Sequence, residues 1–319
     1  MLITINTQSD KRLDVFLAEE LTELSRSQWQ KRIKAGEVLV NGKTVSAGYR
    51  LKVGDKVKFS IFNFQFSNNN KILELTSKKE KADIKNLKNI KIVFESDDYV
   101  VVNKPAGVVV HPDSKYKEGT LVDWLLKNYP EMKGVGEQAE RPGIVHRLDK
   151  DVSGLMVIAR NQLMFEHLKR EFQERRVNKE YLALVHGAVK NDEGEIKVPI
   201  KRSKVKGLFV ADSTFSAESR AALTRYEVIK RYQHFSLLKV KILTGRTHQI
   251  RVHLSSIGHS VVGDKLYVTH DVRIKKKGVE LGRLWLHAAK LSFNDLNFRR
   301  QQFEAELPDE LEAFLNQLK

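Results

Sequence analysis

The spacing of apolar residues changes twice along the chain. Between residues 10 and 60 it first predicts a helix, in which Leu13, Phe16, Leu17, Leu21 and Leu24 recur at helical intervals. A second helix follows over 26–35, with Ser25 as its cap and Gly36 as its end. Apolar residues then flank Asn41-Gly42, a dipeptide typical of two-residue hairpins. These elements predict a small α/β module, which we bound at residues 1–62.

Residues 63–90 break this pattern. They include Asn68-Asn69-Asn70 and most of a lysine-rich stretch over 78–91, and they contain few apolar positions. A segment that cannot bury apolar surface is typical of a linker, so we expect a domain boundary here.

From residue 91 onwards, short apolar strands alternate with amphipathic helices. Strands are predicted over 92–94, 99–102, 155–159, 179–189, 195–200, 221–231, 235–243 and 285–291, and helices over 120–129, 161–176, 247–258 and 308–318. The sequence contains no internal repeat. We therefore treat residues 91–319 as one domain.

A dense group of charged residues lies between two apolar segments of this domain. His146, Arg147, Asp149, Lys150 and Asp151 fall within six residues, and turn-type residues bound them on both sides. A carboxylate flanked by cations suits a role in which it must stay ionised. A surface turn with solvated charges would show the same local pattern, so the pattern alone leaves both interpretations open.

The second dense polar group spans residues 245–254. Thr247 is the predicted cap of its helix, and Gly258 is the predicted end. His248 and Arg251 are three residues apart, which predicts that they share one face of the helix. The N-terminus of such a helix also favours an anion.

The composition of the chain indicates what kind of partner it binds. The chain has 319 residues, a formal net charge of +16 and no cysteine. Such an excess indicates a polyanionic partner, and nucleic acid is favoured over a generally lysine-rich surface. Candidate phosphate contacts are Arg26, Lys31 and Arg32 on the second helix, and two basic loops predicted over 201–207 and 273–277.

Membranes are not an expected partner. The sequence has no long basic amphipathic helix with an aromatic face and no apolar run of membrane-spanning length. The first residues also lack the pattern of a signal peptide. We therefore expect a cytoplasmic protein.

Several chemistries lack their motifs. A phosphate-binding loop ending in Lys-Ser/Thr, a Gly-x-Ser-x-Gly turn and a His-Glu-x-x-His pair are all absent from the sequence. His248 and His253 are five residues apart, which is not the spacing of metal ligands on a helix. No metal site is expected.

What remains is a carboxylate, a tyrosine and an arginine. Asp149 could act as a nucleophile toward a sugar carbon or as a general base. Tyr181 could stack on a base or transfer a proton, although on the strand pattern alone a core tyrosine is the more common outcome. Arg251 could pair with the carboxylate, contact a phosphate or form a surface ion pair. Spacing does not decide among these roles.

Four motifs in order resemble RNA pseudouridine synthases of the ribosomal large-subunit type, the RluA/RluD family. The central motif is His146-Arg147-Leu148-Asp149-Lys150-Asp151-Val152-Ser153-Gly154, and the others are 104–112, 179–181 and 245–254, with a later element at 286–288. Residues 10–60 resemble the alpha-L RNA-binding module that many of these enzymes carry. The resemblance spans nearly the whole chain. The departure is Val152, where the family leads us to expect threonine.

The resemblance implies a fold and a reaction. The fold is α+β, with a mixed, largely antiparallel central sheet and flanking helices, joined to the small N-terminal α/β RNA-binding module. The reaction is an isomerisation: the N-glycosidic bond of a uridine breaks, the uracil rotates, and C5 rejoins the ribose. No redox or group-transfer step occurs, so no cofactor is expected. The implied partner is structured RNA, with ribosomal RNA or a pre-ribosome ahead of tRNA, and the enzyme is expected to act as a monomer.

The resemblance also assigns residues. Asp149 is the essential carboxylate, Arg251 is its first-choice ion-pair partner and Arg246 the second choice. Tyr181 packs on the uracil, and Arg147 fills the space that the flipped nucleotide leaves. His146, Arg246 and His248 complete the expected substrate and RNA contacts.

Two other classes of protein stay open at this point. A non-catalytic RNA-binding assembly factor would use Asp149 structurally. An RNA glycosidase or nuclease would release uracil or cut chains. The sequence names neither the target uridines nor the atom, in ribose or base, that Asp149 attacks.

Overall fold

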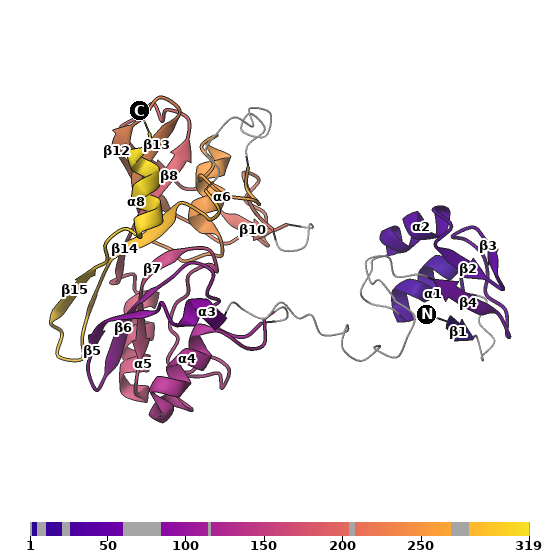
Figure 1. The fold of residues 1–319 in the computed structure, drawn as a ribbon, viewed down its shortest axis with the longest axis horizontal. Helices are drawn as coiled ribbons and strands as arrows, with labels where there is room; N and C mark the ends of the chain where they lie inside the picture. The colour runs from indigo at the N-terminus through magenta and orange to yellow at the C-terminus, as the bar shows by residue number, and fades with distance from the viewer. Residues whose placement is uncertain are drawn as a thin grey trace. The chain divides into compact units, whose positions relative to one another are not determined.

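The computed structural model describes residues 2–4, 11–20, 26–59, 84–113, 116–203, 208–268 and 281–318. The chain divides into two compact units, Met1–Lys78 and Lys79–Lys319 (Figure 1). Each unit has its own buried apolar core. None of the helices in the described ranges is long and apolar enough to cross a membrane.

The N-terminal unit packs two helices on a small antiparallel sheet. The helices are α1 (Leu13–Glu20) and α2 (Arg26–Lys34), and the strand order is β1 (Leu2–Thr4), β4 (Lys56–Phe59), β2 (Val38–Val40), β3 (Lys43–Thr44). Asn41 and Gly42 both have positive φ, 53° and 80°, as a two-residue hairpin with the twist of its strands requires. The predicted second helix and hairpin are confirmed, and the first helix is confirmed over Leu13–Glu20. Leu21, Leu24 and Ser25 lie outside the described residues, and β1 was not predicted.

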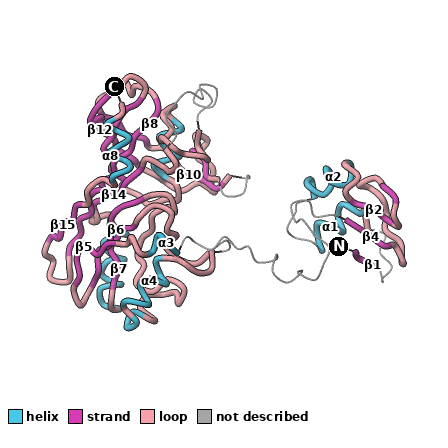
Figure 2. The backbone as a smooth tube through the Cα atoms, in the orientation of Figure 1, coloured by secondary structure: helices cyan, strands magenta, loops and turns pink. Residues whose placement is uncertain are grey.

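The larger unit is built on one nine-stranded sheet. Its strands are β5 (Lys91–Glu95), β6 (Tyr99–Lys104), β7 (Ser153–Ala159), β8 (Asn178–His186), β9 (Glu193–Ile196), β12 (Thr224–Arg231), β13 (Phe235–Ile242), β14 (Leu286–Asn294) and β15 (Arg300–Glu304). The order is β5-β6-β7-β14-β8-β13-β12-β9, with β15 also paired to β14. Among the described strands of this sheet, β7 and β14 pair in parallel and the other pairs are antiparallel, so the expected mixed, largely antiparallel sheet is confirmed. Figure 2 shows these strands among the helices and loops of the unit.

One predicted strand is wrong. Residues 195–200 do not form a single strand, because β9 ends at Ile196 and a separate two-stranded sheet begins with β10 (Ile200–Arg202), which pairs with β11 (Phe209–Ala211). Pro199 lies between them, and a proline cannot donate to a sheet ladder. Lys201 and Arg202, expected in a loop, therefore belong to β10, while 204–207 and 273–277 lie outside the described residues.

Helices cover both faces of the first half of the sheet. On β7, Met156 and Ile158 belong to the core that includes α4 (Leu121–Asn128), whereas Leu155 and Val157 belong to the core that includes α5 (Gln162–Gln173). A strand buried on both faces is apolar at every position, which explains the unbroken apolar run in the sequence. Thr120 and Asn161 cap these two helices with their side chains, and the predicted cap at Thr120 is confirmed.

The remaining helices lie around the second half of the sheet and at the start of the unit. They are α6 (Gln249–Ser256), α8 (Asp309–Asn316), which buries Leu311 and Phe314 as predicted, and the short α3 (Ile84–Leu87). α3 lies within the residues that the sequence pattern assigned to the linker. A 3-10 helix, η1 (Pro130–Met132), follows α4.

The two halves of the sheet meet at a narrow junction. β7 and β14 share the register pairs His287 with Ser153 and Ala288 with Gly154. Gly154 has φ +121°, and a Cβ at this position would lie 2.3 Å from the carbonyl oxygen of Ala288. The close approach of the two backbones therefore requires glycine at position 154. The loop that carries the central motif enters β7 at this junction.

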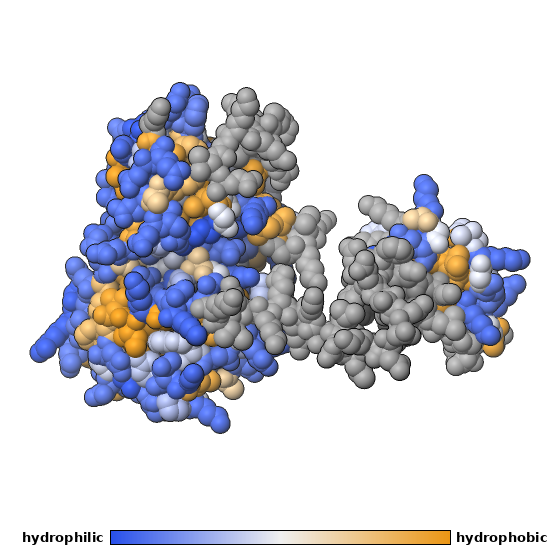
Figure 3. All heavy atoms as spheres, viewed as in Figure 1, coloured by the Kyte–Doolittle hydropathy of each residue, from blue (hydrophilic) through white to orange (hydrophobic). Residues whose placement is uncertain are grey.

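The visible surface of the larger unit is mostly hydrophilic (Figure 3). An apolar area lies over the edge of the sheet near β5, the strand that exposes Ile92, Val93 and Phe94. β5 is the last strand on this side of the sheet, so no further strand within the described ranges pairs with its outer edge.

Candidate active site

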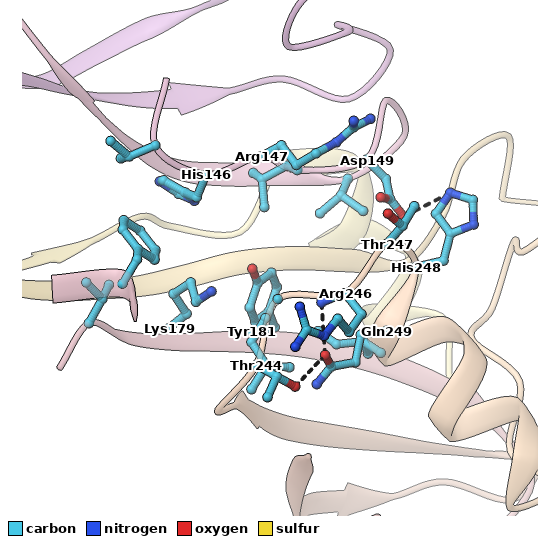
Figure 4. A pocket seen from close by; sticks show the side chains of 18 of the residues that line it. His146, Arg147, Asp149, Lys179, Tyr181, Thr244, Arg246, Thr247, His248 and Gln249 are labelled. Atoms are coloured by element: carbon cyan, nitrogen blue, oxygen red, sulfur yellow. Dashed lines mark hydrogen bonds and ion pairs between the residues drawn. The ribbon is translucent and has the colours of Figure 1, made fainter. Parts of the chain in front are cut away.

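A cavity of about 400 Å³ lies at the centre of the larger unit. It is lined by the loop before β7, by β8, and by the segment from the end of β13 into α6, with Asp149, Tyr181 and Arg251 among its residues. Figure 4 shows Asp149 and Tyr181 in this cavity. The loop comes from one half of the sheet and the other segments come from the other half. The fold therefore brings together residues far apart in the chain, such as Asp149 and Arg251, which are 102 positions apart.

The loop before β7 is anchored at several points. A Cβ on Gly143, which has φ +69°, would lie 2.1 Å from the carbonyl oxygen of Ala159, so this position also requires glycine. The buried ammonium of Lys104 donates hydrogen bonds to the carbonyl oxygens of Pro105, Val108 and Lys150, at 3.0, 2.9 and 3.2 Å. These contacts fix the chain directly after Asp149.

Asp149 pairs with Arg251 rather than with Arg246. Nη1 of Arg251 donates to Oδ2 of Asp149 at 3.0 Å. Arg246 instead donates from Nε to the carbonyl oxygen of Ala221 at 3.2 Å, although its residue also lines the cavity. The structure thus distinguishes the two arginines that the sequence left as first and second choice.

A second carboxylate holds the same guanidinium. Asp264 accepts from Nε and Nη2 of Arg251 at 2.7 and 2.9 Å, and its side chain is only 1% exposed. Burial alone would lower the pKa of Arg251, but the hydrogen bonds and charge of Asp264, together with Asp149, raise it above its ordinary value. Arg251 therefore stays charged between two carboxylates.

Tyr181 lies on β8 with its side chain directed to the cavity (Figure 4). The residue is 5% exposed. Burial, and then the charge of Asp149, raise the pKa of its hydroxyl, so the phenol stays protonated. The ring provides an apolar surface next to the ion pair.

Lys179 lines the cavity two residues before Tyr181. Its Nζ lies 5.2 Å from the centroid of the Phe172 ring, and desolvation lowers its pKa to about 8. Among the described residues its ammonium forms no hydrogen bond or ion pair. The cavity therefore holds a cation with unused hydrogen-bond donors.

His146 and Arg147 are placed differently although they are neighbours. Nε2 of His146 accepts from the backbone N–H of Val157 at 3.1 Å, and its ring stacks on Phe172 at 4.8 Å. Burial and the charge of Lys179 lower the pKa of His146 to about 3, so the ring is neutral and fastens the loop to β7. Arg147 is exposed at the cavity, with Nη1 donating to Nε2 of His111 at 3.2 Å.

The predicted cap of α6 is wrong. The helix begins at Gln249, and its N-cap is His248, which has left-handed backbone angles (φ 56°, ψ 21°) and makes no side-chain cap. Oε1 of Gln249 instead accepts from the Thr244 hydroxyl at 2.7 Å and from the Arg246 N–H at 3.1 Å, which orders the turn before the helix. His248 is therefore not on the helix and does not share a helical face with Arg251.

Two residues around Arg251 were not predicted. Asp264 follows Gly263, which has φ +77°, and its Oδ1 accepts from the backbone N–H groups of Leu266 and Tyr267 at 2.8 and 3.0 Å. The Tyr267 ring lies 5.0 Å from the Arg251 guanidinium carbon. Gly-Asp is a turn signal in the sequence, but such signals are common and do not indicate which turns reach a site.

The N-terminal candidates are in part engaged within their own unit. Arg26 donates from Nε to the buried Asp14 at 2.9 Å while its side chain is 52% exposed, and Arg32 lies 3.5 Å from Glu37. The Lys31 side chain lies outside the described atoms. Within the described ranges, no three His, Asp or Glu side chains converge as a candidate metal site.

Comparison with known families gives two matches. Residues 98–256 match the RNA pseudouridylate synthase family, and residues 11–57 match the S4 domain. The first match covers the loop with Asp149, the strand with Tyr181 and the helix with Arg251.

Comparison with known proteins agrees over a longer range. An uncharacterized RNA pseudouridine synthase of Aquifex aeolicus is 44% identical over 265 residues, 81% of this chain and 77% of that protein. The ribosomal large subunit pseudouridine synthase D of Blochmanniella floridana is 34% identical over 329 residues, 100% of this chain and 98% of that protein.

Solved structures also match the fold. Human RNA pseudouridylate synthase domain containing 4 aligns with a TM-score of 0.58 at 26% identity, over 74% of this chain and 96% of that one. Human RNA pseudouridylate synthase domain containing 1 aligns with a TM-score of 0.55 at 30% identity, over 70% and 84%.

Proposed function

This chain belongs to the RNA pseudouridine synthase family, and we propose that it converts specific uridines of large-subunit ribosomal RNA to pseudouridine. The proposal for ribosomal RNA is supported by relatives of about equal length that are named ribosomal large subunit pseudouridine synthase D. The S4 domain, with Arg26, Lys31 and Arg32 on α2, provides a second RNA-binding unit. A cytoplasmic monomer is the working form that we propose.

Asp149 is the essential carboxylate in this proposal. During the isomerisation the bond from N1 of uracil to C1′ of ribose breaks, a bond from C5 to C1′ forms, C5 loses a proton and N1 gains one. The observation that carries the proposal is the ion pair of Asp149 with Arg251 in a cavity next to Tyr181. A carboxylate held in this way is oriented before the substrate arrives.

The cavity suits a nucleotide that has left its helix. Tyr181 offers a ring on which uracil can pack, and Arg147 is exposed on the loop, where it can occupy the space that the flipped base leaves. Extrusion of a base costs a few kcal/mol. Phosphate contacts of a chain with net charge +16 offset this cost.

The test is to assay ribosomal RNA with the purified chain and with Asp149→Asn. Carbodiimide labelling followed by primer extension detects pseudouridine, whose formation leaves the mass of the RNA unchanged. We expect stops at defined uridines with the wild-type chain and none with Asp149→Asn, while both bind RNA equally in a gel-shift assay. Asp192→Asn, an exposed aspartate on the surface outside the cavity, serves as the matched control.

The alternatives give different results in the same assay. Stops that persist with Asp149→Asn would exclude Asp149 as the essential carboxylate. RNA binding without primer-extension stops, for the wild-type chain and both variants, would indicate a non-catalytic assembly factor. Free uracil on chromatography would indicate a glycosidase, and shortened RNA on a gel would indicate a nuclease.

A further inference from the structure

His248 has an unusual backbone for a residue with a side chain of its size. Its φ of 56° lies in the left-handed region, which glycine and asparagine adopt at lower cost than histidine. Strain of this kind persists where the side chain is needed at that position. Nδ1 of its ring lies 2.7 Å from the Tyr267 hydroxyl and Nε2 lies 3.8 Å from Oδ2 of Asp149. Figure 4 shows the ring of His248 next to Asp149.

The hydrogen bonds around His248 favour one position for the ring proton. The backbone N–H of Phe209 donates to the Tyr267 hydroxyl oxygen at 3.0 Å, and that hydroxyl lies 2.7 Å from Nδ1 of His248. Because the phenol oxygen already accepts one hydrogen bond, donation of its own hydrogen to Nδ1 is favoured. This arrangement favours the neutral tautomer of His248 that carries its proton on Nε2.

Nε2 of His248 faces the same oxygen that Arg251 holds. It lies 3.8 Å from Oδ2 of Asp149, and Nη1 of Arg251 lies 3.0 Å from that atom. In the part of the chain that the structure describes, Oδ1 of Asp149 receives no hydrogen bond. The two oxygens of the carboxylate are thus in different environments.

We propose that His248 is a positioning residue that, together with Arg251, holds Oδ2 of Asp149 through its Nε2–H and leaves Oδ1 as the oxygen that reacts. This inference rests on the proposed function. The gap of 3.8 Å closes to a hydrogen bond when substrate fills the cavity, since such bonds tighten in the complex. Tyr267 acts one step further away, by fixing the tautomer of His248.

Several charged groups surround His248, and all bear on its protonation. Asp149 and Arg147 face it from the loop before β7, Arg251 from α6, and Asp264 from the turn before Tyr267. Desolvation is the largest influence and lowers the pKa of His248 below its ordinary value, with the carboxylates opposing it. The ring of His248 is therefore uncharged at neutral pH.

The first experiment measures single-turnover rates on ribosomal RNA against pH for the wild-type chain, His248→Asn and His248→Gln. Asn favours the left-handed backbone but is too short to reach Asp149, so we expect the rate to fall roughly ten- to a hundredfold with unchanged RNA binding. Gln keeps an N–H donor at similar reach and should restore part of the rate. The protonated ring also carries a hydrogen on Nε2, so the ratio of the wild-type rate to the His248→Asn rate should not decline as the pH falls.

The second experiment observes the tautomer without activity. Nitrogen chemical shifts of the His248 ring should report a proton on Nε2 in the wild-type chain and a mixture of tautomers in Tyr267→Phe. His259→Asn, outside the cavity, is the matched control and should leave the pH profile unchanged.

The outcomes separate the two levels of the proposal. A wild-type chain that forms no pseudouridine contradicts the proposed function. An active wild-type chain whose rate is unchanged in His248→Asn contradicts the role of His248. A proton found on Nδ1 instead of Nε2 contradicts the proposed tautomer of His248 and its hydrogen bond to Oδ2 of Asp149.

Discussion

Arg251 gives two of its N–H groups to Asp264 and one to Asp149. The bidentate contacts to Asp264, at 2.7 and 2.9 Å, are buried, whereas the single contact to Asp149, at 3.0 Å, borders the cavity. Asp264 therefore sets the position of the guanidinium, and the guanidinium sets the position of the proposed catalytic carboxylate. A residue that never reaches the substrate should then control the rate.

Replacement of Asp264 by Asn tests this relationship. The amide keeps the shape of the side chain but removes the charge and one acceptor, so Arg251 is left with an incomplete partner in a buried position. We expect the free energy of unfolding to fall by about 3 kcal/mol. We expect kcat to fall more than tenfold with little change in KM. Urea unfolding and single-turnover assays measure the two effects.

A surface ion pair provides the control for Asp264. Glu195 accepts from Arg225 at 2.8 Å, but both side chains are largely exposed, at 42% and 58%. Glu195→Gln should therefore cost less than about 1 kcal/mol and leave kcat unchanged. Equal changes in the free energy of unfolding and in kcat for Asp264→Asn and Glu195→Gln would show that Asp264 does not position Arg251.

Lys104 predicts a dependence of stability on pH. Desolvation lowers its pKa to about 7 from an ordinary value of 10.5, with Arg283 adding to the effect. Between these two pH values the unfolded chain holds a proton that the folded chain has released, so stability rises with pH. As the pH rises through this window, the free energy of unfolding of the wild-type chain should increase relative to that of Lys104→Met by up to about 1.4 kcal/mol per pH unit. Parallel urea titrations at several pH values measure the difference.

A different pH dependence would contradict the prediction for Lys104. A difference in stability that stays constant from pH 7 to 10.5 would mean that the three carbonyl oxygens around Nζ keep the ammonium charged throughout. Lys169→Met is the control, because Lys169 is a partly exposed lysine on α5 with carboxylate partners.

The elements of this fold were largely predictable because their apolar patterns are local. The period of 3.6 predicted α4 and α5, and the unbroken run at 155–159 predicted a strand buried on both faces. The strand β1 was missed because three residues carry too little pattern. The bend at Pro199, which ends one sheet and starts another, depends on tertiary packing that the spacing of apolar residues does not record.

The site was predictable only where a motif resembled a known family. Asp149, Tyr181 and Arg251 lie in such motifs, and the structure brings all three to one cavity. Asp264 and Tyr267 were missed because a Gly-Asp turn has no chemical signature of its own. The cap at Thr247 was wrong because the Gln249 side chain orders that turn instead, a contact that propensities do not describe.

Lys179 is predicted to bind the RNA. Its ammonium points into the cavity without a carboxylate partner among the described residues, so a substrate phosphate or carbonyl can supply the missing acceptor. Lys179→Met should raise KM several-fold and lower the slope of log K against log salt by about 0.7 to 1. Fluorescence anisotropy at several salt concentrations measures both.

The pH dependence of RNA binding distinguishes charge from packing at Lys179. Desolvation lowers the pKa of this lysine to about 8, so the wild-type KM should rise as pH passes upward through 8 and the ammonium loses its proton. Lys179→Arg keeps its charge in this range and should show a flat, low KM. A wild-type KM that does not change between pH 7 and 9 would argue that the ammonium is not a contact of the RNA.

The N-terminal unit is predicted to add affinity without contributing to the chemistry. Its core is separate from the cores of Lys79–Lys319, so removal of residues 1–78 should leave the larger unit folded. Because α2 carries basic residues that can neutralise phosphates, the truncated chain should bind RNA more weakly and lose less affinity between 50 and 200 mM salt. The rate at saturating RNA should stay within about twofold of the full chain, since all the residues around the cavity remain. Unaltered binding at both salt concentrations would exclude an RNA contact by this unit, and a lost rate at saturation would show that it takes part in the reaction.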